Sequence, residues 1–204
     1  MEPKEPLEEP LKPHPEPPLD FNSRPLPVVV SKEPVYRLNP ASYESSLFFD
    51  RTGRGRFDSQ EQGYGILYVA ADEYAAFIEC FGRVHGARGV AELVLRQRNL
   101  FRITSARPLV LADLTGNGLV KIGADARLTS GAYLIARKWA QAIWQHPQQV
   151  DGIRYHSRHD DTRICWGIFD KSRSLLSEEN LGNLIERHPL LLSEILAHYD
   201  YGLL

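Results

Sequence analysis

The sequence predicts a mixed α+β fold, and three observations lead to that class. Short apolar stretches that alternate with period two, as strands do, occur in both halves of the chain, and two longer segments have helical composition. These strands and helices follow one another without regular alternation, which argues against a doubly wound sheet. With 204 residues, 43% of them hydrophobic, the chain is long enough for one sizeable core.

The first 27 residues are predicted to form an extended arm. Ten of the fourteen prolines lie before residue 35, and the chain begins MEPKEPLEEP. Proline lacks an amide hydrogen, so this segment cannot enter a helix interior or a central strand. We expect residues 1–27 to be disordered or to lie along a surface, as a tether or, alternatively, as a partner-binding segment. Residues 28–204 are expected to form the folded domain.

The folded part is predicted to begin with a strand at residues 34–38, on which Arg37 shares a face with Val35. A loop follows in which Arg51, Arg54 and Arg56 are separated by single glycines or short spacers. Guanidinium groups bind phosphate and carboxylate through two parallel hydrogen bonds, so this loop is a candidate anion site.

The next strand is expected at residues 65–70, with Tyr68 on the same face as Ile66 and Ala70. A helix should then cover residues 72–83, because Asp72 can cap its start and Gly82 can close it. Further strands are expected at residues 89–96, 100–106 and 108–114, with a strand pair at 152–157 and 163–170. The longest helix is expected at residues 130–147, ending at Pro147, and the tail from Ser177 should form two short helices around Pro189.

Composition excludes several classes of function. The net charge is −2, which gives no general attraction for nucleic acid or membranes, and no apolar run approaches the roughly 20 residues needed to cross a bilayer. Cys80 and Cys165 are the only cysteines, too few for a zinc site or a disulfide framework, and we expect both to be buried. The acidic, proline-broken start differs from a signal peptide, so a cytoplasmic protein without a metal site is expected.

Glu79 is the first candidate catalytic residue. On a helix, its neighbours three and four positions away include Ala75, Ala76 and Gly82, whose small side chains leave room for a ligand beside the carboxylate. The alternative is an exposed glutamate that pairs with Arg83 four residues later, which would be worth only about 0.3–0.5 kcal/mol. The pattern alone leaves both interpretations open.

A structural and a ligand-binding role are likewise both open for Arg37, Tyr68 and Ser157. Arg37 lies either on a solvated strand face or in a cleft where it holds an anion, and Tyr68 is either a core aromatic or a stacking surface. Ser157 follows a strand and lies close to His159 and Asp160 in sequence. A Ser-His-Asp nucleophile is a weak interpretation, because adjacent strand residues point to opposite faces and no GxSxG motif is present.

These residues together resemble the RES family, which is named for its Arg, Glu and Ser. The ordered series runs from Arg37 through Gly55-Arg56-Phe57 and the LYVA segment with Tyr68 to Glu79, and then to DGIRYHSR with Ser157. The resemblance extends from about residue 35 to residue 169. It includes the VLADLTG segment and the GAYLIARKWAQAI helix.

The resemblance implies a toxin that degrades NAD. RES proteins resemble ADP-ribosyltransferase toxins, with mixed sheets around an NAD cleft and flanking helices, and they form the toxin half of toxin–antitoxin pairs. The implied activity is NAD glycohydrolase or NAD phosphorylase, which breaks the nicotinamide–ribose bond with water or phosphate. NAD is then a substrate and no cofactor is needed. A Xre-type helix-turn-helix antitoxin and a second copy of the chain are the implied partners.

The resemblance also implies a role for each residue. Glu79 would stabilise the oxocarbenium-like cation at the ribose, as a carboxylate does in glycoside cleavage. Arg37 and Arg56 would hold the diphosphate, Tyr68 would stack on nicotinamide or ribose, and Ser157 would hydrogen-bond to either. We expect the glycines of the loop to let the backbone approach the nucleotide closely. Arg51, Arg54 and Arg158 are secondary candidates without a matching family position.

The chain departs from the family pattern in the loop. Family members commonly read Gly-Gly-Arg-Trp-Asn where this chain has Gly55-Arg56-Phe57-Asp58 after Arg54. An aspartate beside the predicted phosphate site could weaken dinucleotide binding. The stretch between Glu79 and Ser157 is also long, which could add a lid or a dimer contact.

Two other functions stay open. A mono-ADP-ribosyltransferase would use the same cleft to modify a protein, but such enzymes often carry Glu or Gln two residues before the catalytic Glu, where this chain has Phe77. A non-catalytic interaction module, with the proline-rich arm as its working part, would bind no nucleotide.

Overall fold

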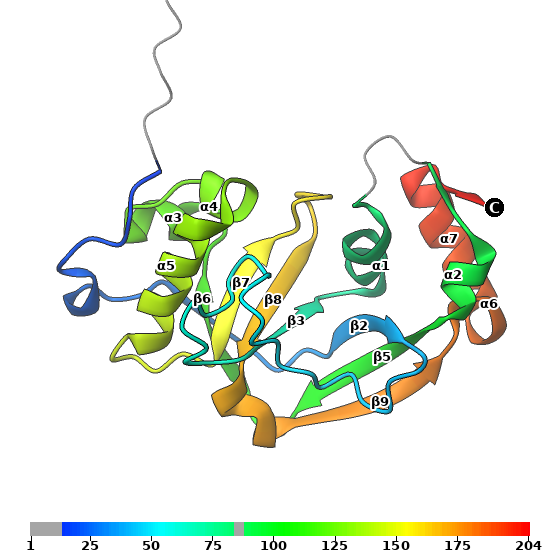
Figure 1. Ribbon diagram of the computed structural model, residues 1–204, viewed down its shortest axis with the longest axis horizontal. Helices are drawn as coiled ribbons and strands as arrows, with labels where there is room; N and C mark the ends of the chain where they lie inside the picture. The colour runs from blue at the N-terminus through cyan, green and yellow to red at the C-terminus, as the bar shows by residue number, and fades with distance from the viewer. Residues whose placement is uncertain (1–13, 84–87) are drawn as a thin grey trace, which may run out of the picture.

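The computed structural model describes residues 14–83 and 88–204, which form one eight-stranded mixed sheet and a small two-stranded sheet flanked by helices (Figure 1). The order of the large sheet is β1-β6-β7-β8-β3-β2-β5-β9. Its strands are β1 (Val28–Ser31), β2 (Val35–Pro40), β3 (Ile66–Ala70), β5 (Arg98–Ser105), β6 (Leu109–Asp113), β7 (Gly152–His156), β8 (Ile164–Phe169) and β9 (Leu176–Gly182). The small sheet pairs β4 (Gly89–Val90) with β10 (Gly202–Leu203). The predicted α+β class is confirmed.

The helices form two groups with the middle strands of the sheet between them (Figure 1). One group contains α3 (Asn117–Ile122), α4 (Arg127–Ser130) and α5 (Tyr133–Gln145), and the other contains α1 (Glu73–Phe81), α2 (Glu92–Arg96), α6 (Leu184–Arg187) and α7 (Pro189–Tyr199). Strands β7, β8 and β3 lie between the groups (Figure 1). Two separate apolar clusters hold the helix groups on the sheet.

The first helix group forms the connection that the one parallel strand pair of the large sheet requires. Strands β6 and β7 run parallel, whereas every other neighbouring pair there is antiparallel. A parallel connection needs a crossover, and α3 to α5 supply it. Helix α5 packs on the sheet through Ala136, Trp139, Ala140 and Ile143, which are all fully buried. The helix predicted at residues 130–147 is present as Tyr133–Gln145 and ends before Pro147, whereas Ser130 belongs to α4.

The large sheet splits between β2 and β3. Among the described residues these strands pair at one position, Tyr36 opposite Ala70. By contrast, β2 pairs with β5 over its whole length, and β3 pairs with β8 over its whole length. The two halves of the sheet therefore diverge beyond Tyr36, and the opening lies between the two helix groups.

The predicted strand faces are confirmed by the packing clusters. Val35 packs with Leu67 and Val69 in one cluster, whereas Tyr36 and Leu38 pack against the helices on the other face. The two faces of the sheet are thus covered by different parts of the chain, as alternation along a strand requires.

Helix α1 has the predicted caps. The Asp72 carboxylate accepts a hydrogen bond from the amide of Ala75 at 2.7 Å, and the amide of Gly82 donates to the carbonyl of Ile78 at 2.7 Å. These caps satisfy backbone groups that a helix end leaves without partners.

The strand predicted at residues 89–96 is wrong. Only residues 89–90 form a strand, and α2 begins at Glu92. Of its apolar residues Leu95 is buried, whereas Leu93 is 67% exposed, so one side of the segment packs inward, as in a surface helix. The C-terminal residue fixes this turn, because the amide of Glu92 donates to the carbonyl of Leu204.

The tail is only partly as predicted. Helices α6 and α7 do lie on either side of His188, and Pro189 occupies the first turn of α7. The segment before them is strand β9 rather than helix, and it pairs with β5 at the sheet edge. Strand β1, which pairs with β6 at the opposite edge, was not predicted.

The described part of the proline-rich arm, residues 14–27, lies against α5. Trp139 Nε1 donates to the carbonyl of Pro15 at 2.9 Å, and Phe21 packs edge-on against Trp139. Residues 1–13 lie outside the described residues. The division at residue 27 stays a prediction.

Candidate active site

A cleft of about 670 Å³ opens where the sheet splits. Its walls come from the diverging ends of β2 and β3, from α1, from the start of α5 and from the loop that carries Arg51, Arg54 and Arg56, called the Arg/Gly loop below. Four of the five predicted site residues line it: Arg37, Arg56, Tyr68 and Glu79. The volume falls within the range of small-molecule sites.

The fifth predicted residue, Ser157, is buried behind Glu79. Ser157 is 2% exposed, and its hydroxyl donates to Glu79 Oε1 at 2.6 Å. The same hydroxyl oxygen accepts the backbone amides of His159 and Asp160, at 3.1 and 3.3 Å. With its oxygen held by two amides, the hydroxyl hydrogen is directed at the carboxylate. Ser157 therefore fixes the position of Glu79.

The contact with Ser157 decides between the two interpretations of Glu79. Arg83 donates to the backbone carbonyl of Glu79 at 3.3 Å, and the carboxylate is bound by Ser157. The small neighbour Ala76 lines the cleft beside it, as the sequence predicted. Glu79 is thus a half-buried cleft carboxylate held in a fixed position.

Two residues beside Glu79 were not predicted as part of the site. Tyr155 on β7 and Cys165 on β8 both line the cleft and are buried. Burial raises the pKa of the Cys165 thiol well above its usual range, and hydrogen bonding to Glu79 adds to the shift. Burial likewise raises the pKa of Tyr155, with a further contribution from the charge of Glu79. Both groups stay protonated at neutral pH, so the wall around Glu79 adds no negative charge.

Buried hydrogen bonds hold the backbone of the Arg/Gly loop. Asp58 is fully buried, and its carboxylate accepts the Gly55 amide at 2.7 Å and the Tyr68 hydroxyl at 2.7 Å. The Tyr68 oxygen in turn accepts the amide of Phe57 at 2.9 Å. Asp58 thus points into the loop interior, where it fixes the backbone on both sides of Arg56.

Gly55 is required by this packing. A Cβ at residue 55 would lie 2.3 Å from Asp58 Oδ1 and 2.6 Å from the Tyr68 hydroxyl oxygen. The glycine therefore admits the buried carboxylate, a role different from the predicted close approach to a nucleotide.

Tyr68 lines the cleft, and its hydroxyl is bound to Asp58 and to the Phe57 amide. Burial raises the pKa of Tyr68 well above its usual range, and the neighbouring Asp58 carboxylate raises it further. The hydroxyl remains a neutral donor that anchors the loop. Stacking of the ring against a ligand stays a prediction.

Arg56 has one guanidinium nitrogen bound and one without a partner. Nη1 donates to the carbonyl of Gly131 at 2.8 Å, and the guanidinium lies over the ring of Tyr133 at 4.5 Å. Nη2 is buried and has no hydrogen-bond partner among the described residues. Because a buried charged donor without a partner is costly, Nη2 is suited to an anionic ligand.

The Arg37 guanidinium also makes hydrogen bonds within the protein. Its Nη1 donates to the carbonyls of Ser46 and Phe48, at 3.0 and 3.3 Å. Burial lowers the pKa of Arg37, but an arginine stays charged at neutral pH. The side chain therefore fastens the 41–50 loop and adds positive charge to the cleft.

The cleft as a whole is strongly basic. Six arginines line it against two carboxylates, Asp50 and Glu79, although the chain has a net charge of −2. The six are Arg37, Arg54, Arg56, Arg83, Arg98 and Arg158. Such a charge distribution attracts anionic ligands. Of the secondary candidates, Arg54 and Arg158 are therefore in the cleft, whereas Arg51 is bound to Asp170 and the carbonyl of Gln62.

The Ser-His-Asp interpretation finds no support in the geometry. The Ser157 hydroxyl contacts the backbone amide of His159. The Asp160 carboxylate accepts from Thr162 Oγ1 at 2.6 Å and from the Tyr199 hydroxyl at 3.0 Å. Asp160 therefore stabilises the hairpin and its contact with α7.

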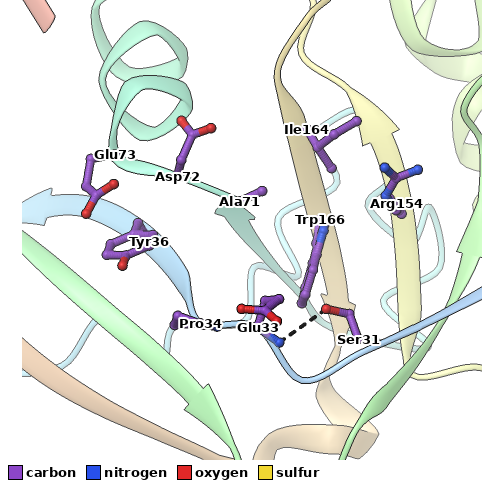
Figure 2. Close-up of a pocket in the computed structure, with 10 residues that line it drawn as sticks. All are labelled: Ser31, Glu33, Pro34, Tyr36, Ala71, Asp72, Glu73, Arg154, Ile164 and Trp166. Atoms are coloured by element: carbon purple, nitrogen blue, oxygen red, sulfur yellow. Dashed lines mark hydrogen bonds between the residues drawn. The ribbon is translucent and has the colours of Figure 1, made fainter.

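A second pocket of about 430 Å³ lies at the other end of α1, between Trp166, Tyr36 and the start of the helix (Figure 2). It is lined by the carboxylates of Glu33, Asp72 and Glu73 and by one arginine, Arg154, which is paired with Asp113, and by none of the predicted site residues. Its acidic lining does not suit a diphosphate, so the basic cleft is the candidate active site.

Cys80 differs from its prediction, because it is half-buried and lines the cleft, whereas Cys165 is buried as predicted. Both thiols are free. In the described part of the chain there is no cluster of three or more residues that could hold a metal ion, and no helix long and apolar enough to span a bilayer.

Comparisons with known proteins identify the family and the fold of the chain. The family model of the RES domain matches residues 34–188. A protein named "Probable toxin y4kH" from Sinorhizobium fredii (strain NBRC 101917 / NGR234) is 29% identical over 100 residues, which cover 48% of this chain and 76% of that protein. A chain in the crystal structure of the M. tuberculosis MbcT-MbcA toxin–antitoxin complex superposes with a TM-score of 0.60 at 17% identity, covering 83% of this chain and 92% of that chain. This structural match shows a shared fold.

Proposed function

Because the chain belongs to the RES domain family, we propose that it is a toxin that breaks the nicotinamide–ribose bond of a nicotinamide dinucleotide. The observation that carries the proposal is the Glu79 carboxylate, fixed by Ser157 inside a cleft with six arginines. The chemistry needs a carboxylate at a cationic sugar carbon and positive charge at a diphosphate, and the cleft supplies both.

In the proposed reaction the bond between C1′ of the ribose and the nicotinamide nitrogen breaks. The electron pair leaves with nicotinamide, which becomes neutral, and C1′ becomes oxocarbenium-like. Glu79 stabilises this cation electrostatically. Nicotinamide needs no proton to leave, so one carboxylate suffices. Water then attacks C1′ and releases a proton to the solvent, which gives ADP-ribose. Alternatively, hydrogen phosphate attacks the same carbon through an oxygen, which gives ADP-ribose-1″-phosphate.

The remaining residues bind and position. Arg56, through its unpartnered Nη2, and Arg37 hold the diphosphate, while the Tyr68 ring stacks on nicotinamide or ribose. Ser157 acts first as a positioning residue, because it is buried and bound to Glu79. Tyr155 and Cys165 keep the surroundings of Glu79 neutral.

A protein-modifying transferase is disfavoured by Phe77. This residue stands two positions before Glu79, where such enzymes often have Glu or Gln, and it is fully buried in the cluster that holds α1 to α7. No polar side chain from this position can reach a target protein.

We also propose a partner, an antitoxin that covers the cleft. Its support is the likeness to a chain from a toxin–antitoxin complex and to a relative named as a probable toxin. A Xre-type helix-turn-helix protein is the partner implied by family membership. The substrate implies that the toxin acts in the cytoplasm.

The test is release of nicotinamide from NAD by the purified protein. We expect Glu79→Gln to lower the rate by about a hundredfold to a thousandfold or more, since it removes the charge that stabilises the cation. Glu73→Gln is the matched control, because Glu73 lies on the same helix but lines the other pocket, and it should retain activity. Free ADP-ribose would indicate water as acceptor, the 1″-phosphate would indicate phosphate, and label on protein would indicate a transferase.

Absence of nicotinamide release by the wild-type protein, with or without phosphate, would contradict the proposed function. So would equal rates for wild type and Glu79→Gln.

A further inference from the structure

We propose that Tyr133, the first residue of α5, is a positioning residue for Arg56: its ring holds the Arg56 guanidinium in the orientation that receives the diphosphate of the dinucleotide. The inference deepens the proposed function, because it rests on the proposed binding of the diphosphate by Arg56. Tyr133 itself takes no part in the proposed cleavage.

Arg56 needs such a support because its one close hydrogen bond does not fix the plane of the guanidinium. Nη1 donates to the carbonyl of Gly131 at 2.8 Å, and a second contact of the same nitrogen, to the carbonyl of Leu128, is long at 3.5 Å. A planar group held through one nitrogen can still rotate about that bond. A ligand that had to stop this rotation would lose affinity, because ordering a flexible side chain on binding costs conformational entropy.

The ring of Tyr133 supplies the missing contact. The central carbon of the Arg56 guanidinium lies 4.5 Å from the ring centroid, within the distance of about 6 Å at which a cation is attracted to an aromatic face. Tyr133 and Arg56 both line the cleft, and Tyr133 is 37% exposed. With Nη1 on the Gly131 carbonyl and the central carbon over the ring, Nη2, which has no partner among the described residues, is left for an anion.

Tyr133 also offsets repulsion between neighbouring arginines. The guanidinium of Arg137 lies 5.6 Å from its ring centroid, and Arg158 Nη1 donates to its hydroxyl in a long contact of 3.5 Å. Burial lowers the pKa of Arg56, and the positive charge of Arg158 lowers it further. The negative face of an aromatic ring attracts cations. One tyrosine therefore contacts three guanidiniums that repel each other, at the place where the diphosphate is proposed to bind.

Helix α5 holds the ring in a fixed place relative to the Arg/Gly loop. Arg137, one turn after Tyr133, donates from Nε to the carbonyl of Gly55 at 2.9 Å, and Gly55 directly precedes Arg56. Further along the helix, Trp139 is fully buried in the core. The same rigid helix therefore fixes the backbone before Arg56 and the side chain of Arg56, which is the support that a preorganised binding residue requires.

The binding test uses ADP-ribose, which carries the diphosphate but no nicotinamide bond, so it does not depend on catalysis. Tyr133→Leu keeps an apolar side chain but removes the ring, and it should raise the Kd measured by calorimetry by about fivefold to thirtyfold. Tyr133→Phe keeps the ring and should stay within about threefold of the wild type. Leu134→Ala is the matched control and should bind as the wild type does, because Leu134 is the next residue of α5, is 54% exposed and lies outside the cleft lining.

The kinetic test separates binding from chemistry. Loss of an interaction that holds the substrate equally before and during the reaction raises KM and leaves kcat unchanged. For nicotinamide release by Tyr133→Leu we therefore expect KM to rise by about fivefold to thirtyfold and kcat to change by less than about twofold.

A double-mutant cycle tests whether Tyr133 acts through Arg56. In the Arg56→Ala background, Tyr133→Leu should weaken ADP-ribose binding by less than about twofold, because the guanidinium that the ring holds is already gone. A tyrosine that only stabilised the start of α5 would give the same loss in both backgrounds. If Arg56→Ala binds no ADP-ribose at high ligand concentration, the separation of KM from kcat decides instead.

An unchanged Kd for Tyr133→Leu would overturn the inference, as would equal weakening by Tyr133→Leu and Tyr133→Phe, or equal losses in both backgrounds. A wild-type protein that binds no ADP-ribose would overturn it too, since Arg56 would then have no diphosphate to hold. Failure to release nicotinamide, with the predicted order of ADP-ribose affinities intact, would instead contradict the proposed cleavage and leave the role of Tyr133 standing.

Discussion

At the scale of single residues, the contact between Glu79 and Ser157 holds the one carboxylate that the proposed reaction needs. Ser157 donates to Glu79 and is itself held by two backbone amides, so the carboxylate has few orientations available. A carboxylate fixed before the substrate binds needs no reorganisation when the sugar becomes cationic. The buried serine is therefore as important for the proposed reaction as a residue that touches the substrate.

Removing the Ser157 hydroxyl should affect kcat more than KM. We expect Ser157→Ala to lower kcat by about a hundredfold, because a carboxylate displaced by about 1 Å loses that much rate. Steady-state kinetics of nicotinamide release measures both constants. Ser172→Ala is the matched control, since Ser172 is also buried and also donates to a carboxylate, that of Asp151, away from the cleft. An equal loss of activity in both variants would show that Ser157 has only a structural role.

Asp58 should be needed to position Arg56. Asp58→Ala leaves the Gly55 amide and the Tyr68 hydroxyl without their buried acceptor. Each unpaired group should lower the free energy of unfolding by about 1–3 kcal/mol. We expect a KM for the dinucleotide raised about tenfold or more. Asp58→Asn, which restores the residue common in the family and keeps an acceptor oxygen, should preserve more of the affinity. A KM for Asp58→Ala equal to that of the wild type would contradict this role.

The sequence predicted which residues line the cleft better than it predicted the buried contacts that hold those residues in place. Glu79, Arg37, Arg56 and Tyr68 were recognised because they occur in a fixed order, and all four line the cleft. The inward direction of Asp58 and the place of Ser157 behind Glu79 depend on burial, which the order of residues does not reveal. Cys165 carried no signal beyond its apolar strand.

At the scale of secondary structure, α1 connects the two pockets and carries Glu79, the proposed catalytic residue, near its C-terminal end. Its N-terminus is fixed by Asp72, which caps the helix and also binds Arg163 at 3.1 Å. The position of Glu79 therefore depends on a contact almost two turns away.

Loss of the cap should destabilise the protein. We expect Asp72→Ala to lower the free energy of unfolding by about 0.5–2 kcal/mol, measured by chemical denaturation. Asp72→Asn should retain most of the stability, because asparagine caps helices equally well, although it loses the ion pair with Arg163. Equal destabilisation by both substitutions would assign the effect to the ion pair.

Elements fixed by local signals were predicted, and those fixed by distant partners were not. Helix α1 has its own caps, and β7 and β8 form a hairpin from adjacent segments. Strand β9 is mostly polar, with Leu176 as its one buried residue. It is a strand because it pairs with β5, where Glu179 opposes Arg102. A charged strand of this kind is typical of a sheet edge, where it discourages aggregation.

At the scale of the whole molecule, the split sheet creates the cleft. Strands β2 and β3 share one paired position and then diverge, so backbone and side chains from both halves reach the same space. The two helix groups stand on either side of this opening (Figure 1). The fold therefore concentrates arginines from β2, β5, the Arg/Gly loop and the segments after α1 and β7 around the cleft that contains Glu79, in a chain that is slightly acidic overall.

The basic cleft predicts that dinucleotide binding depends on salt. Raising the ionic strength from about 0.05 to 0.5 M shortens the Debye length severalfold and screens the exposed arginines. We expect the affinity of the Glu79→Gln variant for the dinucleotide, measured by calorimetry, to fall by about tenfold. An affinity that does not change with salt would show that the arginines contribute little to binding.

The central claim is that Glu79 faces the anomeric carbon of a bound nicotinamide dinucleotide, and a crystal structure of Glu79→Gln with the intact dinucleotide tests it most directly. We predict that the side chain of residue 79 lies within about 3–4 Å of C1′ of the nicotinamide ribose, with the diphosphate on Arg56 and Arg37. A dinucleotide bound elsewhere, or one whose C1′ lies across the cleft from residue 79, would contradict the account.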